Sequence, residues 1–307
     1  MLAEDGTWVA HAGAVSHVAV AGLCAAGRGA VAWPIMPATI YAIANQKGGV
    51  AKTTTAASLA AALSARGQAV LAVDLDPQAC LTFSLGYDPD SLEPTMYDVI
   101  GGRAPIAKTI LQHREMDLVP SSIDLAGAEV ALLARTGREY VLSGELDDLR
   151  ETYDTIIIDC PPSLGVLTLN GLTAAHQVVI PLQCETLSHR GVSQLLETIA
   201  DVKRLTNREL EVAGLVATMF DGRTKHARAV LADVTERYGL PVVGVPVRKS
   251  VRFAEAPNLG YTIFGHDPSV PGAAAYRLIA AELAGLEVDA ADEEAAGTVP
   301  GTPLDAG

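Results

Sequence analysis

Short apolar runs alternate with longer amphipathic stretches along most of the chain. Continuous runs rich in β-branched residues are typical of strands buried on both faces, whereas apolar residues spaced by three and four form one face of a helix. These patterns predict strands at 39–44, 69–73, 117–120, 155–158, 177–181, 212–218 and 242–245, and helices at 54–65, 125–133, 192–205 and 273–283. The alternation indicates a doubly wound α/β fold with a mainly parallel sheet, whose ligands bind at the carboxyl ends of the strands.

The two ends of the chain depart from this pattern. Residues 9–32 are rich in Ala, Val and Gly, but polar residues interrupt them, so they fall short of the ~20 apolar residues of a membrane span. Glu4 and Asp5 stand where a secretory signal would be basic. Residues 286–307 contain Asp, Glu and Pro but no Lys or Arg. We therefore expect a poorly ordered N-terminal extension at 1–38, a folded domain at 39–285 and an acidic disordered tail at 286–307.

Composition narrows the class of protein. Hydrophobic residues make up 49% of the 307 positions and charged residues 19%, which excludes a wholly disordered chain. The formal net charge of −14 argues against coating DNA with the whole surface, because two polyanions repel each other. Any DNA contact must then come from a local basic patch. The cysteines include no CxxC pair, so neither a zinc ribbon nor a dense disulfide framework is indicated, and a reducing cytoplasm is expected.

One loop contains the most specific indication of a binding site. Residues 45–54 read Asn-Gln-Lys-Gly-Gly-Val-Ala-Lys-Thr-Thr and join the first predicted strand to the first predicted helix. Gly48 and Gly49 let successive backbone N–H groups turn toward an anion, and the start of the helix adds donors and partial positive charge. Lys52 is placed to reach the β- and γ-phosphates of a nucleotide, and the Thr53 hydroxyl to bind Mg²⁺. A simple Gly-Gly turn is the alternative, but the Lys-Thr-Thr run at the helix start favours a phosphate loop.

This loop departs from the strict GxxxxGK[ST] pattern, because Gln46 and Ala51 occupy its glycine positions. Residues 47–54 instead resemble the deviant Walker A motif of the ParA/MinD ATPases, with Ala51 in place of the usual Gly. Asp-Leu-Asp-Pro-Gln at 74–78 is similar to the second motif of that family, and 156–163 resembles its Walker B strand. Residues 221–224 and 251–257 resemble late motifs of the ParA/Soj branch. The likeness covers about residues 39–285 and implies a ParA-like P-loop ATPase domain.

The resemblance implies an ATP site with Mg²⁺ and assigns residues to it. Those expected to bind ATP are Lys47, Gly48, Gly49, Val50, Ala51, Lys52, Thr53, Thr54, Met219 and Arg248, the last standing where many relatives have Pro. Those expected near Mg²⁺ are Thr53, Asp76 and Asp159, and those expected in catalysis are Lys47, Lys52 and Asp76.

The roles of Lys47 and of the neighbouring Asp74 have alternatives. By resemblance, Lys47 reaches the phosphates of a partner subunit, which makes formation of a homodimer depend on ATP; otherwise it is a surface lysine. By resemblance, Asp76 positions or activates the attacking water. Asp74 helps to fix the metal and the loop, or it only caps the following turn.

A basic segment suggests contact with DNA. Residues 203–252 contain ten Lys and Arg against five Asp and Glu, within a chain of net charge −14. Such a run is usually a solvated face. The ParA/Soj resemblance implies more, because Arg223 and Arg252 match positions that contact double-stranded DNA without sequence preference. It also implies a ParB-like centromere-binding partner that stimulates ATP hydrolysis, and a cytoplasmic, nucleoid-associated protein.

The expected function is therefore an ATP-dependent partitioning ATPase of a chromosome or plasmid. One alternative is a MinD-like membrane-associated division-site ATPase, or another ATP-driven positioning protein. A membrane role would call for a basic amphipathic C-terminal helix, whereas this tail is acidic, so no membrane partner is expected. A third class is a metabolic P-loop enzyme, such as a nitrogenase-reductase-like protein or an ATP-dependent synthetase. The former needs cysteines that bridge an iron–sulfur cluster, and neither Cys160 nor Cys184 is convincingly placed for that.

Overall fold

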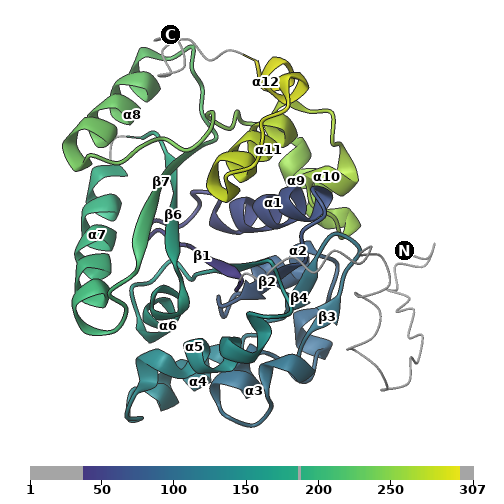
Figure 1. Ribbon diagram of the computed structural model, residues 1–307, viewed down its shortest axis with the longest axis vertical. Helices are drawn as coiled ribbons and strands as arrows, with labels where there is room; N and C mark the ends of the chain where they lie inside the picture. The colour runs from purple at the N-terminus through teal and green to yellow at the C-terminus, as the bar shows by residue number, and fades with distance from the viewer. Residues whose placement is uncertain (1–36, 186–187, 298–307) are drawn as a thin grey trace. The chain divides into compact units, whose positions relative to one another are not determined.

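A seven-stranded sheet organises the described residues, 37–185 and 188–297, of the computed structural model (Figure 1). Its strands lie in the order β3-β4-β2-β5-β1-β6-β7, and only the short β3 runs antiparallel to its neighbour. The strands are β1 Thr39–Ile43, β2 Val70–Asp74, β3 Leu111–Gln112, β4 Asp117–Val119, β5 Thr155–Asp159, β6 Gln177–Gln183 and β7 Glu211–Thr218. The prediction of a doubly wound, mainly parallel α/β fold is confirmed.

Helices cover both faces of this sheet (Figure 1). They are α1 Lys52–Ala65, α2 Cys80–Ser84, α3 Met96–Ile100, α4 Leu125–Leu132, α5 Val141–Leu146, α6 Val166–Ala174, α7 Ser188–Leu205, α8 Lys225–Tyr238, α9 Arg252–Glu255, α10 Ile263–His266, α11 Pro271–Ala284 and α12 Ala290–Ala296. Short 3₁₀ turns at Pro89–Ser91, Ile106–Lys108, Arg138–Tyr140, Asp147–Leu149 and Ala256–Leu259 complete the connections. Among these described helices, none has both the length and the apolar character needed to cross a membrane.

The core has two halves because successive side chains of a strand point to opposite faces. In β5, Ile156 and Ile158 pack with α3 to α8, while Ile157 packs with α1, α2 and α11. All five residues of β5 are buried. Burial on both faces is why this strand is a continuous apolar run and shows no alternation of polar and apolar positions.

The strand predicted at 242–245 is wrong. Only Val242 makes a single parallel bridge, to Leu215 of β7, and the segment adds no strand to the sheet. Gly244 has φ +61, outside the range of a strand, and the backbone there lies so close to α11 that a Cβ would fall 2.7 Å from Ile279. Pro241 and Pro246 on either side lack the N–H group that a ladder requires.

The acidic segment at the C-terminus is folded as far as residue 297, where a disordered tail was expected from 286 onward. Asp292 of α12 is buried and pairs with Arg277 of α11 at 2.5 Å, and Arg66 donates to the carbonyl of Glu287 at 2.7 Å. The charge count missed this because Arg66 and Arg277, which bind the segment, both lie outside it. Residues 298–307, and all but the last two residues of the extension expected at 1–38, lie outside the described part.

Candidate functional site

Three neighbouring strands end at one edge of the sheet and bring the expected site together. In the parallel register, Asp159 at the end of β5 lies opposite Ile43 of β1 on one side and Asp74 of β2 on the other. The loop that follows β1 leads directly into α1. The phosphate loop and the expected carboxylates therefore share the carboxyl edge, where parallel sheets bind ligands.

Two side chains outside the motif core hold the loop in place. Asn45 donates from Nδ2 to the carbonyl of Pro181 in β6 at 2.7 Å, and its Oδ1 accepts from the N–H of Lys47 at 3.0 Å. The Thr218 hydroxyl at the end of β7 donates to the carbonyl of Val50 at 3.0 Å. The loop is thus hydrogen-bonded to β6 and β7 and covalently continuous with β1. The sequence analysis did not single out Asn45 or Thr218, whose roles depend on neighbours far away in the chain.

The backbone of the loop adopts an uncommon conformation. Ala51, immediately before α1, has φ 62 and ψ 37, the left-handed region in which a Cβ is unfavourable. Within the described residues, the other non-glycine residues with positive φ are Ala79 and Met219, which follow β2 and β7. All three strained positions therefore lie beyond the carboxyl ends of strands on the site's side of the sheet. Such strain is often concentrated at ligand sites.

The space beside the two glycines is open. A Cβ built on Gly48 or Gly49 would meet no atom within 4 Å, and Gly49 also has a positive φ of 74. Open space beside consecutive backbone N–H groups at a helix start suits the close approach of a phosphate. The loop thus fits the polyphosphate of a nucleotide.

Lys52 lies inside this loop. It is 7% exposed, and its Nζ donates to the carbonyl of Lys47 at 3.2 Å. Burial lowers the pKa of Lys52, while the carboxylates of Asp159 and Asp76 act in the opposite direction. The ammonium group therefore lies at the loop and within electrostatic reach of Asp159 and Asp76, where it can bind an incoming phosphate.

Asp159 has unused hydrogen-bonding capacity. Neither of its buried carboxylate oxygens has a hydrogen-bond partner of normal geometry among the described residues. Burial raises its pKa well above the usual range and the charge of Asp74 raises it further, while the nearby Thr53 hydroxyl lowers it. Oxygen donors of this kind are the ligands that Mg²⁺ prefers. The orphaned carboxylate beside a hydroxyl thus fits a magnesium ion.

Asp74 and Asp76 differ in their surroundings. Asp74 is fully buried and accepts hydrogen bonds from the N–H and hydroxyl of Thr82, at 2.8 and 2.7 Å, and from the N–H of Asp76 at 3.2 Å. Burial raises the pKa of Asp74 to about 7. The Asp76 carboxylate accepts one hydrogen bond from the described residues, from the N–H of Gln78 at 2.9 Å, and its charge raises the pKa of Lys52. Asp74 thus orders the turn before α2, whereas Asp76 keeps capacity for a ligand.

Lys47 makes its ion pair outside the loop. Its Nζ pairs with Glu185, just beyond β6, at 2.7 Å, and its side chain is 29% exposed. Glu185 was not identified from the sequence, since a single acidic residue after a strand carries no pattern of its own.

Met219 and Arg248, both expected to bind ATP, lie on neighbouring backbone segments. Met219 follows Thr218 directly and so lies next to the phosphate loop. Arg248 is bridged to Phe220 by backbone pairing, and its guanidinium lies beside Gly297 at the end of α12.

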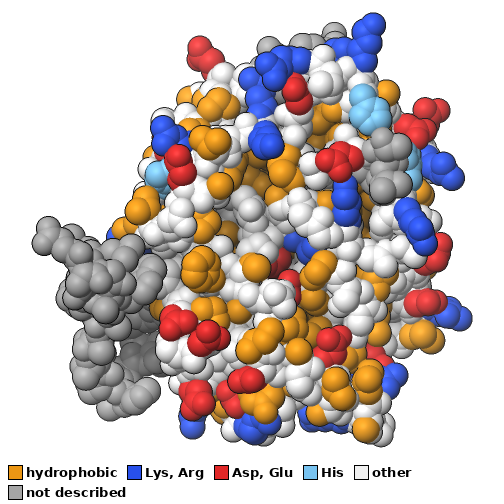
Figure 2. All heavy atoms as spheres, turned by 180° about the vertical axis from the view of Figure 1, so that it is seen from behind, with side chains coloured by type: hydrophobic (Ala, Val, Ile, Leu, Met, Phe, Trp, Pro, Cys, Tyr) orange, Lys and Arg blue, Asp and Glu red, His pale blue; other side chains and the backbone are white. Residues whose placement is uncertain are grey.

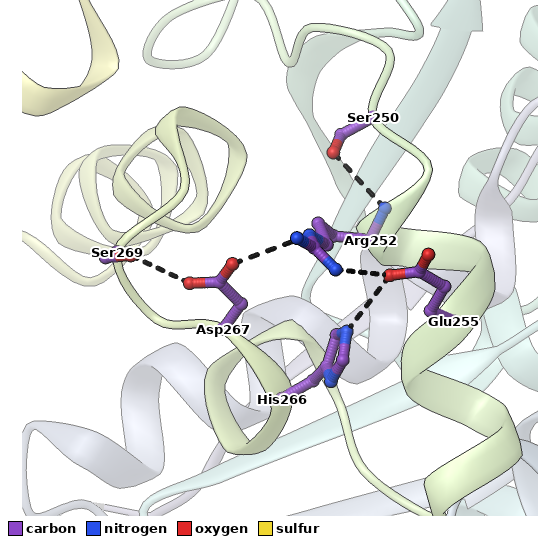
Figure 3. A network of polar contacts seen from close by, with 6 residues as sticks. All are labelled: Ser250, Arg252, Glu255, His266, Asp267 and Ser269. Carbon is purple, nitrogen blue, oxygen red and sulfur yellow. Dashed lines mark hydrogen bonds and ion pairs between the residues drawn. The ribbon is translucent and has the colours of Figure 1, made fainter.

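The two arginines expected to contact DNA lie in different environments. The Arg223 side chain is 91% exposed and donates to both carboxylate oxygens of Asp221, at 2.9 and 3.0 Å. Arg252 of α9 lies between Glu255, at 2.8 Å, and Asp267, at 3.7 Å, and His266 also faces Glu255 (Figure 3). Arg252 therefore joins α9 to the α10 region and is already partly neutralised. On the face shown in Figure 2, Lys and Arg side chains gather toward the upper end, while Asp and Glu are frequent toward the lower end.

Comparison with known proteins agrees with this geometry. The family model described as AAA domain (AAA_31) matches residues 38–212. The sporulation initiation inhibitor protein Soj of Bacillus subtilis is 42% identical over 247 residues, covering 80% of this chain and 98% of that protein. The chromosome partitioning protein ParA of Myxococcus xanthus is 41% identical over 269 residues, covering 87% and 95%.

A solved structure is also similar. The crystal structure of cobyrinic acid a,c-diamide synthase from Mycobacterium smegmatis, with a bound ATP analogue and magnesium, is 51% identical. It superposes with a TM-score of 0.72 over 80% of this chain and 94% of that one. The sheet order, the deviant phosphate loop and the extended similarity to Soj and ParA lead to one assignment: the chain belongs to the ParA/Soj family of P-loop ATPases.

Proposed function

We propose that this protein is a partitioning ATPase that dimerises with ATP and, in that state, binds nonspecific double-stranded DNA. The observation that carries the proposal is that two lysines of one loop lie in different surroundings. Lys52 is buried and bonded to its own loop, whereas Lys47 is partly exposed and paired with Glu185 beyond β6. One lysine serves the nucleotide of its own subunit, and the other is free to serve a nucleotide across an interface once it leaves Glu185.

ATP binds at the loop through its phosphates. The backbone N–H groups of residues 48–53 and the ammonium of Lys52 neutralise the phosphate oxygens. Thr53 and Asp159 would hold Mg²⁺. When bound, this ion would supply positive charge beside the phosphates. The orphaned oxygens of Asp159 support this role.

Hydrolysis resets the protein. Asp76 orients the attacking water, because its carboxylate is near the loop and less occupied by internal hydrogen bonds than Asp74. Loss of the γ-phosphate removes the ligand of the partner's Lys47 and the dimer separates. A ParB-like partner stimulates this step, and DNA binding through Arg223 and its neighbours keeps the ATP form on the nucleoid, within the cytoplasm.

Sizing the protein with and without Mg·ATP tests the proposal. Wild type should shift from monomer to dimer and then be retained on random-sequence duplex DNA. Lys52→Ala should lose ATP binding, whereas Lys47→Ala should bind ATP and stay monomeric. A Lys47→Ala dimer identical to wild type would contradict the cross-subunit role, and a wild-type dimer that ignores both DNA and a ParB-like partner would contradict partitioning.

A second candidate is an ATP-dependent synthetase, which the 51% identity to the diamide synthase structure favours. If such an enzyme drew ammonia from glutamine, it would use an activated cysteine with a depressed pKa. The described cysteines are shifted the other way: burial raises the pKa of Cys184 to about 12 and also raises those of Cys80 and Cys160. ATP turnover that requires a carboxylic acid substrate and an ammonia donor, and is indifferent to DNA and a ParB-like protein, would favour the synthetase.

A further inference from the structure

Lys47 is held by a residue of its own subunit. Its Nζ lies 2.7 Å from Oε2 of Glu185, although the two residues are 138 positions apart. Glu185 sits in a turn beyond β6, with its N–H donating to the carbonyl of Gln183 at 2.8 Å. The contact thus joins the phosphate loop to the segment that leads from β6 toward α7.

Gly191, in the first turn of α7, lies close to Asn45 and Lys47. A Cβ on Gly191 would lie 3.2 Å from Oδ1 of Asn45 and 3.8 Å from Cβ of Lys47. Asn45 in turn fixes the N–H of Lys47. The backbone of Lys47 is therefore held by Asn45, while the ammonium group at the end of its side chain can change partners.

Glu185 and a partner's phosphate compete for this ammonium. The side chains of Lys47 and Glu185 are 29% and 53% exposed, so their ion pair is screened by water and can exchange. A triphosphate with Mg²⁺ still carries more negative charge than one carboxylate. A state with Lys47 released is thus accessible, but it has to be populated before the lysine reaches across an interface.

We propose that Glu185 is a positioning residue that holds Lys47 against its own subunit until ATP and a second copy of the chain draw it away. The inference rests on the proposed cross-subunit role of Lys47. Glu185 raises the nucleotide concentration that dimerisation requires, and so restrains the dimer when nucleotide is scarce.

The test compares the dimer fraction of wild type, Glu185→Gln and Glu185→Asp across a titration of a slowly hydrolysed ATP analogue with Mg²⁺. Glu185→Gln should lower the half-maximal concentration by about threefold, the size expected when a partly exposed ion pair no longer competes. Glu185→Asp keeps the charge and should stay close to wild type. Glu197→Gln, which removes a charge from α7 at a residue bonded to Ser193, is the matched control and should change nothing.

A second readout separates positioning from general damage. Nucleotide affinity measured on monomers, at low protein concentration, should be the same for wild type and Glu185→Gln, because Lys47 does not serve its own nucleotide. An unchanged or raised half-maximal concentration for Glu185→Gln, with a wild type that dimerises normally, would overturn the inference. A wild type that never dimerises with nucleotide would instead overturn the proposed function.

Discussion

The Thr218 hydroxyl and the Val50 carbonyl, 168 positions apart in the chain, form a buried hydrogen bond of 3.0 Å. Both residues are almost fully buried, so neither group can turn to water instead. The bond joins the end of β7 to the loop one residue before the strained Ala51. It therefore links the strand that precedes Met219 to the conformation of the phosphate loop.

Thr218→Val should weaken both the fold and ATP binding. The substitution keeps the shape but leaves the Val50 carbonyl unpaired, which costs about 1–3 kcal/mol of stability. Because that carbonyl lies in the loop, ATP affinity should fall as well. Chemical denaturation and an ATP titration measure the two effects, with Thr218→Ser, which keeps the hydroxyl, as control. Wild-type ATP affinity in Thr218→Val would show that the bond does not shape the loop.

Ala51→Gly should stabilise the protein. Ala51 has φ 62, where a Cβ costs roughly 1–2 kcal/mol, and glycine removes that cost while losing more freedom on folding. We expect a net gain of up to about 1 kcal/mol in denaturant unfolding. Ala61→Gly, inside α1, should instead lose about 1 kcal/mol or more. If both glycines destabilised equally, the left-handed conformation of Ala51 would carry no strain.

Asp76→Ala should bind ATP and hydrolyse it poorly. Among the described residues, the Asp76 carboxylate accepts only the N–H of Gln78, so its loss should leave the fold largely intact. Nucleotide titration and phosphate release measure the two steps. Asp74→Ala should behave differently, because it removes the acceptor of three internal hydrogen bonds and should lower stability first. Wild-type turnover in Asp76→Ala would remove it from the candidate catalytic residues.

His176 should make stability depend on pH. Its Nδ1 accepts from the N–H of Ile40 at 2.9 Å, which requires the neutral ring. Burial lowers its pKa and the charge of Arg150 lowers it further, with Glu209 opposing. The unfolded chain thus takes up this proton at a higher pH than the folded one, so stability is lost as the pH falls below about 6.5.

His176→Asn isolates that effect, because the Asn oxygen can accept the same N–H and does not titrate. Its unfolding free energy should fall less than that of wild type between pH 7.5 and 5.5, by up to about 1.4 kcal/mol per unit of pKa shift. Asp74, whose pKa is raised to about 7, acts in the opposite direction but is present in both proteins and cancels. Parallel pH profiles would show that His176 is not held neutral.

Arg223→Glu should remove DNA binding more cleanly than Arg252→Glu. Arg223 is 91% exposed, so reversing its charge mainly adds repulsion toward phosphate. Arg252→Glu would set a third carboxylate beside Glu255 and Asp267 and should also loosen α9 (Figure 3). Retention on duplex DNA across a salt series, with sizing of the same samples, measures both. An Arg223→Glu dimer with unchanged affinity and salt slope would exclude Arg223 from the DNA contact.

The sequence alone determined the parallel α/β sheet and the place of the phosphate loop. Runs such as 155–158 consist of β-branched residues, a composition that by itself indicates a buried strand. The motif from Lys47 to Thr54 is contiguous in the sequence. The positions of Asp74, Asp76 and Asp159 followed, because parallel strands end at a common edge.

Only the tertiary structure decided which distant side chains contact the phosphate loop. Glu185 meets Lys47 and Thr218 meets Val50 across more than a hundred positions, and such contacts leave no periodic signal. The acidic composition of 286–297 likewise hid α12, which packs Ala296 on α11 and pairs Asp292 with Arg277 of that helix. Local pattern reflects local burial, whereas pairing between distant charges and hydroxyls exists only once the sheet has brought their strands together.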